Sequence, residues 1–179
     1  MTTRGLWCGA GDCGQSRHDV VEFVKKVAGA GFNLLLPELK GGHGLLRYPS
    51  KKFRQAVEPG YEEFDLPAHL LDACKSHGVE VHAWFIDFFE GEDGPAFRTH
   101  PDWAALDKSG SPTNIETLRG ERFTGLWMCP ARLPGYADQW LQPIYEEFVE
   151  LYEFDGVHHD YVRYPGDLAP DQYCFCDYC

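Results

Sequence analysis

The chain is poor in basic residues and has no long hydrophobic run. Lys and Arg number 16 against 28 Asp and Glu, which gives a formal net charge of −12 over 179 residues. Such an excess of negative charge repels phosphate backbones and anionic lipid, so it argues against a nucleic-acid or membrane partner. No apolar segment reaches the roughly 18 residues needed to span a bilayer, and the first residues, MTTR, do not resemble a signal peptide. We therefore expect a cytoplasmic protein.

Short apolar runs alternate along the chain with amphipathic stretches. The content of 44% hydrophobic and 15% aromatic residues is sufficient for a buried core. The apolar runs predict four strands, at residues 6–9, 33–37, 79–88 and about 154–161. Helical spacing lies between them, with Ser16 and Asp65 as expected N-caps and Pro143 as either a kink or a first-turn residue. This order predicts a parallel sheet covered by helices.

A parallel sheet of this kind is either doubly wound or closed into a barrel, and we favour the barrel. A complete (β/α)8 TIM barrel needs about 250 residues, whereas only four strand units appear here. We therefore expect residues 1–179 to form the N-terminal half of one TIM-barrel catalytic domain. Because an open half-barrel exposes strand edges and core surface, we expect a missing C-terminal half or a partner chain to cover it.

A long connection at about residues 90–134 separates the third predicted strand from its helix. In a barrel this connection lies on the C-terminal face, where active sites form, and connections of such length are usually functional or disordered. We interpret it as a partial roof over the site. Trp103 is a candidate substrate contact, because a tryptophan in a loop has less core to join.

The most informative stretch is residues 155–165, which read DGVHHDYVRYP. Side chains alternate along a strand, so His158 and Asp160 share one face and His159 takes the other. Asp160 stands at the C-terminal end of the strand, where barrels place catalytic residues, and is the candidate nucleophile or base. The structural alternative is that Asp160 caps the following loop or pairs with Arg163.

This stretch resembles the DG(I/V)HxDYxRYP signature of glycosyl-hydrolase-like proteins with TIM-barrel folds. Further matching pieces are YPSK at 48–51, HPDW at 100–103, WMCP at 127–130 and CFCDYC at 174–179. The stretch is also similar to the DGFRxD motif of the α-amylase superfamily, with His158 in place of its Arg. The resemblance implies hydrolysis of O-glycosyl bonds in an oligosaccharide or polysaccharide. It further implies Asp160 as nucleophile and, as general acid, a Glu from a later strand beyond Cys179.

Other polar residues near the predicted strand ends are candidate substrate contacts. Glu38 and Asp87 follow the second and third predicted strands and are expected to line the same mouth, together with His158. Arg163 is expected to hold Asp160 ionised by charge pairing. Carboxylates, histidines and aromatics of this kind fit a carbohydrate substrate. Without the later strand, the 179 residues alone are expected to have little or no activity.

Cys174, Cys176 and Cys179 place three thiols within six residues, and Cys129 is a candidate fourth ligand. Four thiolates fit a tetrahedral zinc site. A similar arrangement is a structural zinc site in family 42 β-galactosidases, and the resemblance implies a structural metal here. Free thiols or an incomplete cluster are the alternatives. The odd total of seven cysteines argues against a disulfide framework.

Two other function classes stay open at this point. A non-catalytic carbohydrate-binding barrel would keep the cleft and lack the acid. A metal-dependent hydrolase or deacetylase would use His158 and Asp160 with a further histidine such as His43 or His82.

Overall fold

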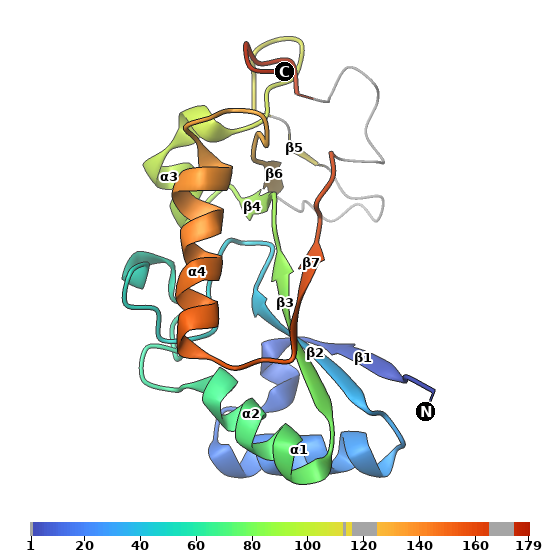
Figure 1. Ribbon diagram of the computed structural model, residues 1–179. Helices are drawn as coiled ribbons and strands as arrows, with labels where there is room; N and C mark the ends of the chain where they lie inside the picture. The colour runs from blue at the N-terminus through green and yellow to red at the C-terminus, as the bar shows by residue number, and fades with distance from the viewer. Residues whose placement is uncertain (1, 113, 116–124, 165–173) are drawn as a thin grey trace.

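The computed structural model describes residues 2–112, 114–115, 125–164 and 174–179. Its main feature is a parallel sheet with the strand order β1-β2-β3-β7 (Figure 1). The strands are β1 (Gly5–Cys8), β2 (Leu34–Lys40), β3 (Glu80–Ile86) and β7 (Gly156–Asp160). The four predicted strands are confirmed, although β2 continues past the predicted end to Lys40.

Helices α1 (Arg17–Gly29) and α2 (Leu66–His77) begin at the caps that the sequence predicts. The Ser16 hydroxyl oxygen accepts the Asp19 N–H at 3.2 Å, and Asp65 Oδ1 accepts the Ala68 N–H at 3.1 Å. Helix α2 ends at Gly78, whose φ of 66° is the left-handed conformation that glycine adopts easily. No helix in the described part of the chain is both long and apolar enough to cross a membrane.

The third helix that covers the sheet, α4 (Gln142–Leu151), continues directly from a π-helical turn, η4 (Ala137–Leu141). Pro143 lies in the first turn of α4, which is one of the two positions predicted for it. Proline has no N–H to donate to the preceding turn, so a change in helical geometry at this point leaves no donor unpaired. The main core forms between α1, α2, α4 and the sheet face that carries Leu35, Val81 and Phe85.

The opposite face of the sheet is concave and faces away from the helices. Trp7 on β1 and His158 on β7 project from it, and their ring centroids are 5.6 Å apart. These are the two outer strands, which in a flat sheet would be separated by three spacings of about 4.8 Å. The rings meet because the sheet curls. The predicted architecture is therefore confirmed as a partial α/β barrel of four strand units.

Residues 9–14 read GAGDCG, which is the glycine spacing of dinucleotide-binding turns. In those turns a helix follows directly and points its N-terminus at the pyrophosphate. Here the residues form a short 3-10 helix, η1 (Ala10–Cys13), and α1 starts only at Arg17. The local structure thus differs from a dinucleotide site and agrees with the barrel.

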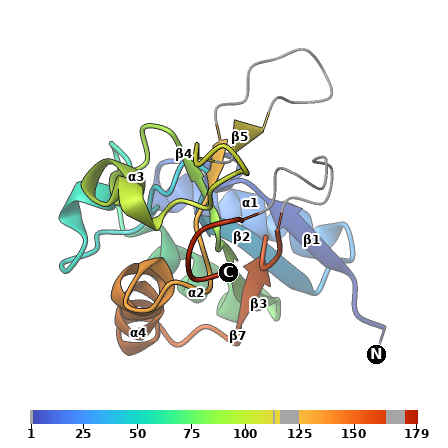
Figure 2. The same cartoon turned by 90° about the horizontal axis from the view of Figure 1, so that it is seen from above.

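The long connection after β3 contains regular structure that sequence periodicity did not reveal. A small antiparallel sheet has the order β4-β6-β5 and lies near the C-terminal ends of β3 and β7 (Figures 1 and 2). Its elements and the neighbouring helices are β4 (Phe89–Gly91), β5 (Asn114–Ile115), β6 (Gly125–Trp127), α3 (Pro95–Thr99) and η3 (Pro101–Trp103). A further 3-10 turn, η2 (Arg54–Ala56), precedes α2.

Candidate functional site

Asp160 is the last residue of β7 and lies on the concave face at the C-terminal end of the sheet. Its Oδ2 accepts a hydrogen bond from the Trp84 indole N–H at 3.1 Å, and its Oδ1 accepts the Tyr161 backbone N–H at 2.7 Å. The side chain is half-buried. Both carboxylate oxygens are therefore held in fixed directions while the group stays accessible.

The backbone turns sharply immediately after Asp160. Tyr161 has a φ of 54°, a left-handed conformation that is uncommon for a residue with a side chain. Its ring stacks on Trp127 at 5.6 Å and lies 5.4 Å from the ring of Phe89. Backbone conformations of this kind concentrate at functional sites, where surrounding packing maintains them. The aromatic packing thus supports the turn that brings the Tyr161 N–H to Asp160.

His158 and Asp160 share the concave face, as strand alternation predicts. Trp7, which contacts His158, is 57% exposed and so is not a core residue. Glu38 lies within β2 in register with Trp84, so it projects from the same face. Its carboxylate is hydrogen-bonded to Arg47.

Arg163 does not pair with Asp160, so the expected ion pair is wrong. The Arg163 guanidinium carbon lies 4.8 Å from the centre of the Tyr161 ring and 5.4 Å from that of Trp127. Among the described residues, no ion pair joins Arg163 to a carboxylate. A weakly hydrated, planar guanidinium is favourably placed over aromatic faces, and this stacking takes the place of the expected charge pair.

Asp87 follows β3 but turns to the helix side of the sheet, away from the face that carries Asp160. Its Oδ2 is 3.0 Å from His159 Nδ1, and its Oδ1 accepts the hydroxyl of Tyr145 on α4. Burial raises the pKa of Asp87, and the bonds from Tyr145 and His159 oppose that rise. Neighbouring residues of a strand face opposite sides of the sheet. Asp87 comes one position after Ile86, the end of β3, and so faces the helices rather than the mouth of the site that the sequence predicted for it.

Trp103 is 5% exposed and packs within the main core. Its ring stacks on His100 with centroids 3.8 Å apart. The expectation that a tryptophan in this connection has little core to join is wrong, because the main core extends into the connection and includes Ala96 and Met128 as well as Trp103. The Cys129 N–H also bonds to the Trp103 carbonyl at 2.8 Å.

A buried polar cluster behind the C-terminal ends of β2 and β3 was not predicted from the sequence. Lys40 and Glu90 are both fully buried, and Lys40 Nζ lies 3.0 Å from Glu90 Oε1. The Tyr136 hydroxyl lies 2.6 Å from the same carboxylate oxygen. Burial, together with the nearby Glu90 charge, raises the pKa of Tyr136 well above its usual value, so the hydroxyl keeps its proton. The one sequence signal for this buried cluster was Lys40, a lysine that directly continues the apolar run of β2.

The four cysteines predicted as ligands are brought together. The sulfur atoms of Cys129, Cys174, Cys176 and Cys179 all lie within 4.8 Å of one another, with Cys129 buried just after β6. The Cys129 sulfur is 3.5 Å from that of Cys176 and 3.6 Å from that of Cys179. The cluster can therefore hold a metal ion. In the described part of the chain, no such group combines His158 and Asp160 with His43 or His82.

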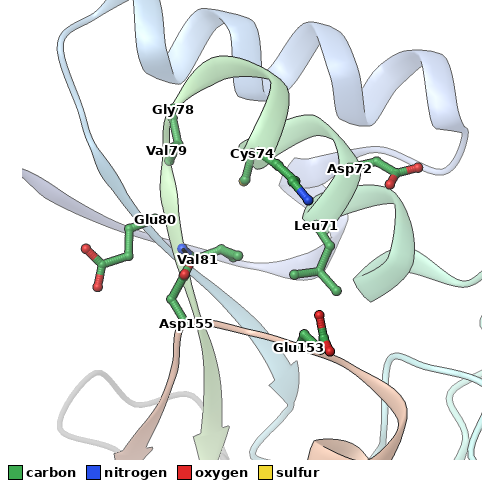
Figure 3. A pocket seen from close by; sticks show the side chains of 10 residues that line it. Leu71, Asp72, Cys74, Gly78, Val79, Glu80, Val81, Glu153 and Asp155 are labelled. Atoms are coloured by element: carbon green, nitrogen blue, oxygen red, sulfur yellow. Dashed lines mark hydrogen bonds between the residues drawn. The ribbon is translucent and has the colours of Figure 1, made fainter.

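A hollow of about 610 Å³ lies at the opposite end of the sheet, between α2 and the start of β3 (Figure 3). Its lining includes Asp72, Glu80, Glu153 and Asp155. Asp155 serves the fold, since its Oδ2 accepts the Val81 N–H at 2.9 Å. In α/β barrels the N-terminal ends of the strands serve stability rather than catalysis, so this hollow is separate from the Asp160 site.

Asp160 and the aromatic rings beside it thus lie at the C-terminal end of a curled parallel sheet, which is the end where α/β barrels in general carry their active sites. The chain belongs to the family described as glycosyl hydrolase-like 10, whose model matches residues 3–178. It is also 30% identical over 132 residues to a glycosyl hydrolase, YngK, of Bacillus subtilis (strain 168). That match covers 66% of this chain and 22% of the relative, so the chain spans less than a quarter of the relative's length.

Solved structures agree on the fold. A hypothetical protein from Ruminiclostridium thermocellum ATCC 27405 is similar with a TM-score of 0.68 and 19% identity, over 90% of this chain and 78% of that one. An α-galactosidase from Thermus thermophilus is similar with a TM-score of 0.57 and 16% identity, over 87% of this chain and 30% of that one. A maltogenic α-amylase from Thermotoga neapolitana is similar with a TM-score of 0.55 and 15% identity, over 93% of this chain and 39% of that one. The chain thus has the fold of a part of these larger proteins.

Proposed function

We propose that this chain forms part of a glycoside hydrolase in which Asp160 is the nucleophile. The observation that carries the proposal is the position of Asp160 on the concave face, with both oxygens oriented by N–H groups of Trp84 and Tyr161. Catalytic side chains of α/β barrels stand at this end of the strands. Membership of the glycosyl hydrolase-like 10 family supports the same reaction class.

In a retaining reaction, one Asp160 oxygen attacks the anomeric carbon as its bond to the leaving oxygen breaks. A second carboxylic acid gives its proton to the leaving oxygen. Water then attacks the same carbon, which releases Asp160 and returns a proton to the second carboxylate. The two groups stand about 5–5.5 Å apart in retaining enzymes. We propose that a Glu on a strand beyond Cys179 supplies the acid and that the later strands close the barrel.

The concave face offers suitable contacts for a sugar. Trp7 and Trp84 present aromatic surface against which the apolar face of a sugar ring can pack. His158 and Glu38 present polar atoms to hydroxyl groups on the same face. Arg163, exposed beside Tyr161, is a further candidate contact at the rim. Asp87 and Trp103 are assigned to the support of the site because both side chains are buried.

The test is Asp160→Asn in the full-length protein, with release of reducing sugar measured over a panel of oligosaccharides. Loss of the nucleophile is expected to lower kcat by several orders of magnitude. Asp72→Asn, an exposed aspartate on α2, is the matched control and should hydrolyse normally. Hydrolysis that is unchanged in Asp160→Asn would overturn the assignment.

A non-catalytic carbohydrate-binding barrel is the second candidate, favoured by the exposure of Trp7 beside His158. Calorimetric titration of the full-length protein with the same oligosaccharides separates the two functions. Binding without any hydrolysis would establish the binding module. Turnover that depends on Asp160 would establish the enzyme.

We also propose that the four-cysteine cluster holds a structural zinc ion. A tetrahedral site with Zn–S bonds of about 2.3 Å places its sulfur atoms roughly 3.8 Å apart, which is close to the distances from Cys129 to Cys176 and Cys179. When bound, zinc would join the end of β6 to residues 174–179. Thiolate ligands require reducing conditions, and all seven cysteines are free, so we propose a cytoplasmic location.

Metal analysis of the purified protein tests the zinc proposal. We expect about one zinc per chain, lost in Cys129→Ser. Cys74→Ala, which removes a buried thiol outside the cluster, should retain the metal. Zinc that survives in Cys129→Ser but is lost on changing His158 would contradict the proposal and favour a catalytic metal.

A further inference from the structure

We infer that Lys40 is a positioning residue for Asp160, acting through the single peptide group that joins Ile86 to Asp87. The inference rests on the proposed function of Asp160 and extends it to a cluster that does not touch the substrate. It follows from the hydrogen-bond partners of the C=O and of the N–H of that peptide group.

The Ile86 carbonyl accepts a hydrogen bond from Lys40 Nζ at 2.6 Å. The N–H of the same peptide group, on Asp87, donates to the Asp160 carbonyl at 2.9 Å. The C=O and N–H of a trans peptide point in opposite directions, so this one group bridges the lysine on β2 and the candidate nucleophile on β7. A cation at the carbonyl polarises the peptide and strengthens its N–H as a donor.

Further contacts hold the Lys40 ammonium group in this position. It also lies 3.0 Å from Glu90 Oε1 and 3.4 Å from the Asp87 carbonyl. The Tyr136 hydroxyl lies 2.8 Å from that carbonyl as well. Two consecutive carbonyls, of Ile86 and Asp87, are therefore held from one side, while the N–H between them holds Asp160 from the other.

Stability alone is a poor explanation for this cluster. A buried ion pair costs desolvation that its attraction often fails to offset, and apolar replacements are frequently neutral or stabilising. The second oxygen of Glu90 is buried with no hydrogen-bond partner within the described structure, which adds to the cost. The Lys40–Glu90 pair lies directly behind the strand ends that carry Asp160. A role in positioning Asp160 explains why a buried pair stands there.

Trp84 provides a readout that does not require a known sugar. Its indole N–H donates to the Asp160 carboxylate at 3.1 Å, so the ¹⁵N–¹H resonance of this group reports the distance and protonation of that carboxylate. Trp84→Phe assigns the resonance in full-length protein labelled at tryptophan. The indoles of Trp103 and Trp140, which are buried elsewhere, report whether the fold is retained.

The experiment compares the full-length protein with the double variant Lys40→Met, Glu90→Gln, which removes both charges of the buried pair together. The Trp84 resonance should move, and its pH titration should shift, while those of Trp103 and Trp140 stay in place. On any oligosaccharide that the protein hydrolyses, kcat should fall by roughly 10²-fold, as for a misplaced catalytic group, with KM little changed. Lys26→Met, an exposed lysine on α1, is the matched control.

A folded double variant with an unchanged Trp84 resonance and titration would refute the inference. If the double variant does not fold, Tyr136→Phe removes only the hydroxyl that lies near both the Asp87 carbonyl and the Glu90 carboxylate, and it should shift the Trp84 resonance in the same direction by less. No shift there would also refute it. Hydrolysis that survives Asp160→Asn defeats the proposed function alone, because the Trp84 readout depends on geometry and on no reaction.

Discussion

Gly44 is the residue that makes room for the buried carboxylate of Glu90. Its φ of +73° lies in the left-handed region, and a Cβ atom there would stand 1.7 Å from Glu90 Oε2. No ordinary van der Waals contact is that short, so a side chain at this position must displace the carboxylate. The ion pair with Lys40 therefore depends on a glycine four positions after Lys40, the last residue of β2.

Gly44→Ala is accordingly expected to destabilise the protein by more than the backbone strain alone. That strain is about 1–2 kcal/mol for a residue with a side chain in the left-handed conformation. Gly110→Ala is the matched control, because Gly110 has a similar φ of +81° and no heavy atom within 4 Å of the added carbon. Urea unfolding measures both free energies. Equal losses in the two variants would show that the space beside Glu90 is unimportant.

At the scale of elements, α4 is tied to the loop before α2 by one buried carboxylate. Glu147 on α4 is 3% exposed, and its Oε1 accepts the N–H groups of Lys51 and Lys52, each at 2.9 Å. Its other oxygen accepts the Ser50 hydroxyl. This carboxylate satisfies backbone donors that would otherwise lie unpaired, and it fixes α4 against the loop between β2 and α2.

Glu147→Gln should therefore lower the free energy of unfolding by about 1–2 kcal/mol, because hydrogen bonds to a charged acceptor are stronger than those to an amide. Glu150→Gln, one turn further along α4, removes only an exposed ion pair with Lys52 and should change stability little. Thermal or urea unfolding of the two variants gives the comparison. A larger effect at Glu150 would contradict this account of α4.

Local signals predicted those elements that local interactions determine. Ser16 and Asp65 cap their helices as expected, and alternation along β7 placed His158 and Asp160 on one face. Strands β4, β5 and β6 escaped prediction because each has only two or three residues, and because β4 pairs with β6 across 34–38 positions of sequence. Their stability comes from tertiary packing, which leaves no period in the sequence.

The candidate site was predictable only in part for the same reason. The sequence placed Asp160 at a strand end and the four cysteines in one cluster, since both follow from motif spacing. It did not predict that Arg163 stacks on Tyr161 or that Asp87 turns towards His159. Those choices depend on partners 2 and 72 positions away and on which face of the sheet a single residue takes.

At the scale of the whole molecule, the described part of the chain pairs no strand with the outer edge of β1 or of β7. The concave face is also open, with Trp7 57% exposed on it. Unpaired strand edges and exposed apolar surface favour association. This chain thus has the surface expected of a barrel portion that other strands cover.

Residues 1–179 expressed alone are therefore expected to self-associate and to hydrolyse no oligosaccharide that the full-length protein cleaves. Sedimentation equilibrium at several concentrations measures the association, and the reducing-sugar assay measures the activity. A stable monomer with a single cooperative unfolding transition and full activity would contradict the assignment of the chain as part of a barrel.

The contact between Trp7 and His158 has a consequence for how such a barrel assembles on the ribosome. The two residues are 151 positions apart, a length that takes on the order of 10 s to synthesise. Their rings meet only when β7 has joined the sheet, so the four strands described here can adopt this curvature without any further strand. The first four strands would then set the curvature of the barrel, and each later strand would pair onto the open edge at β7 of a sheet that is already curved.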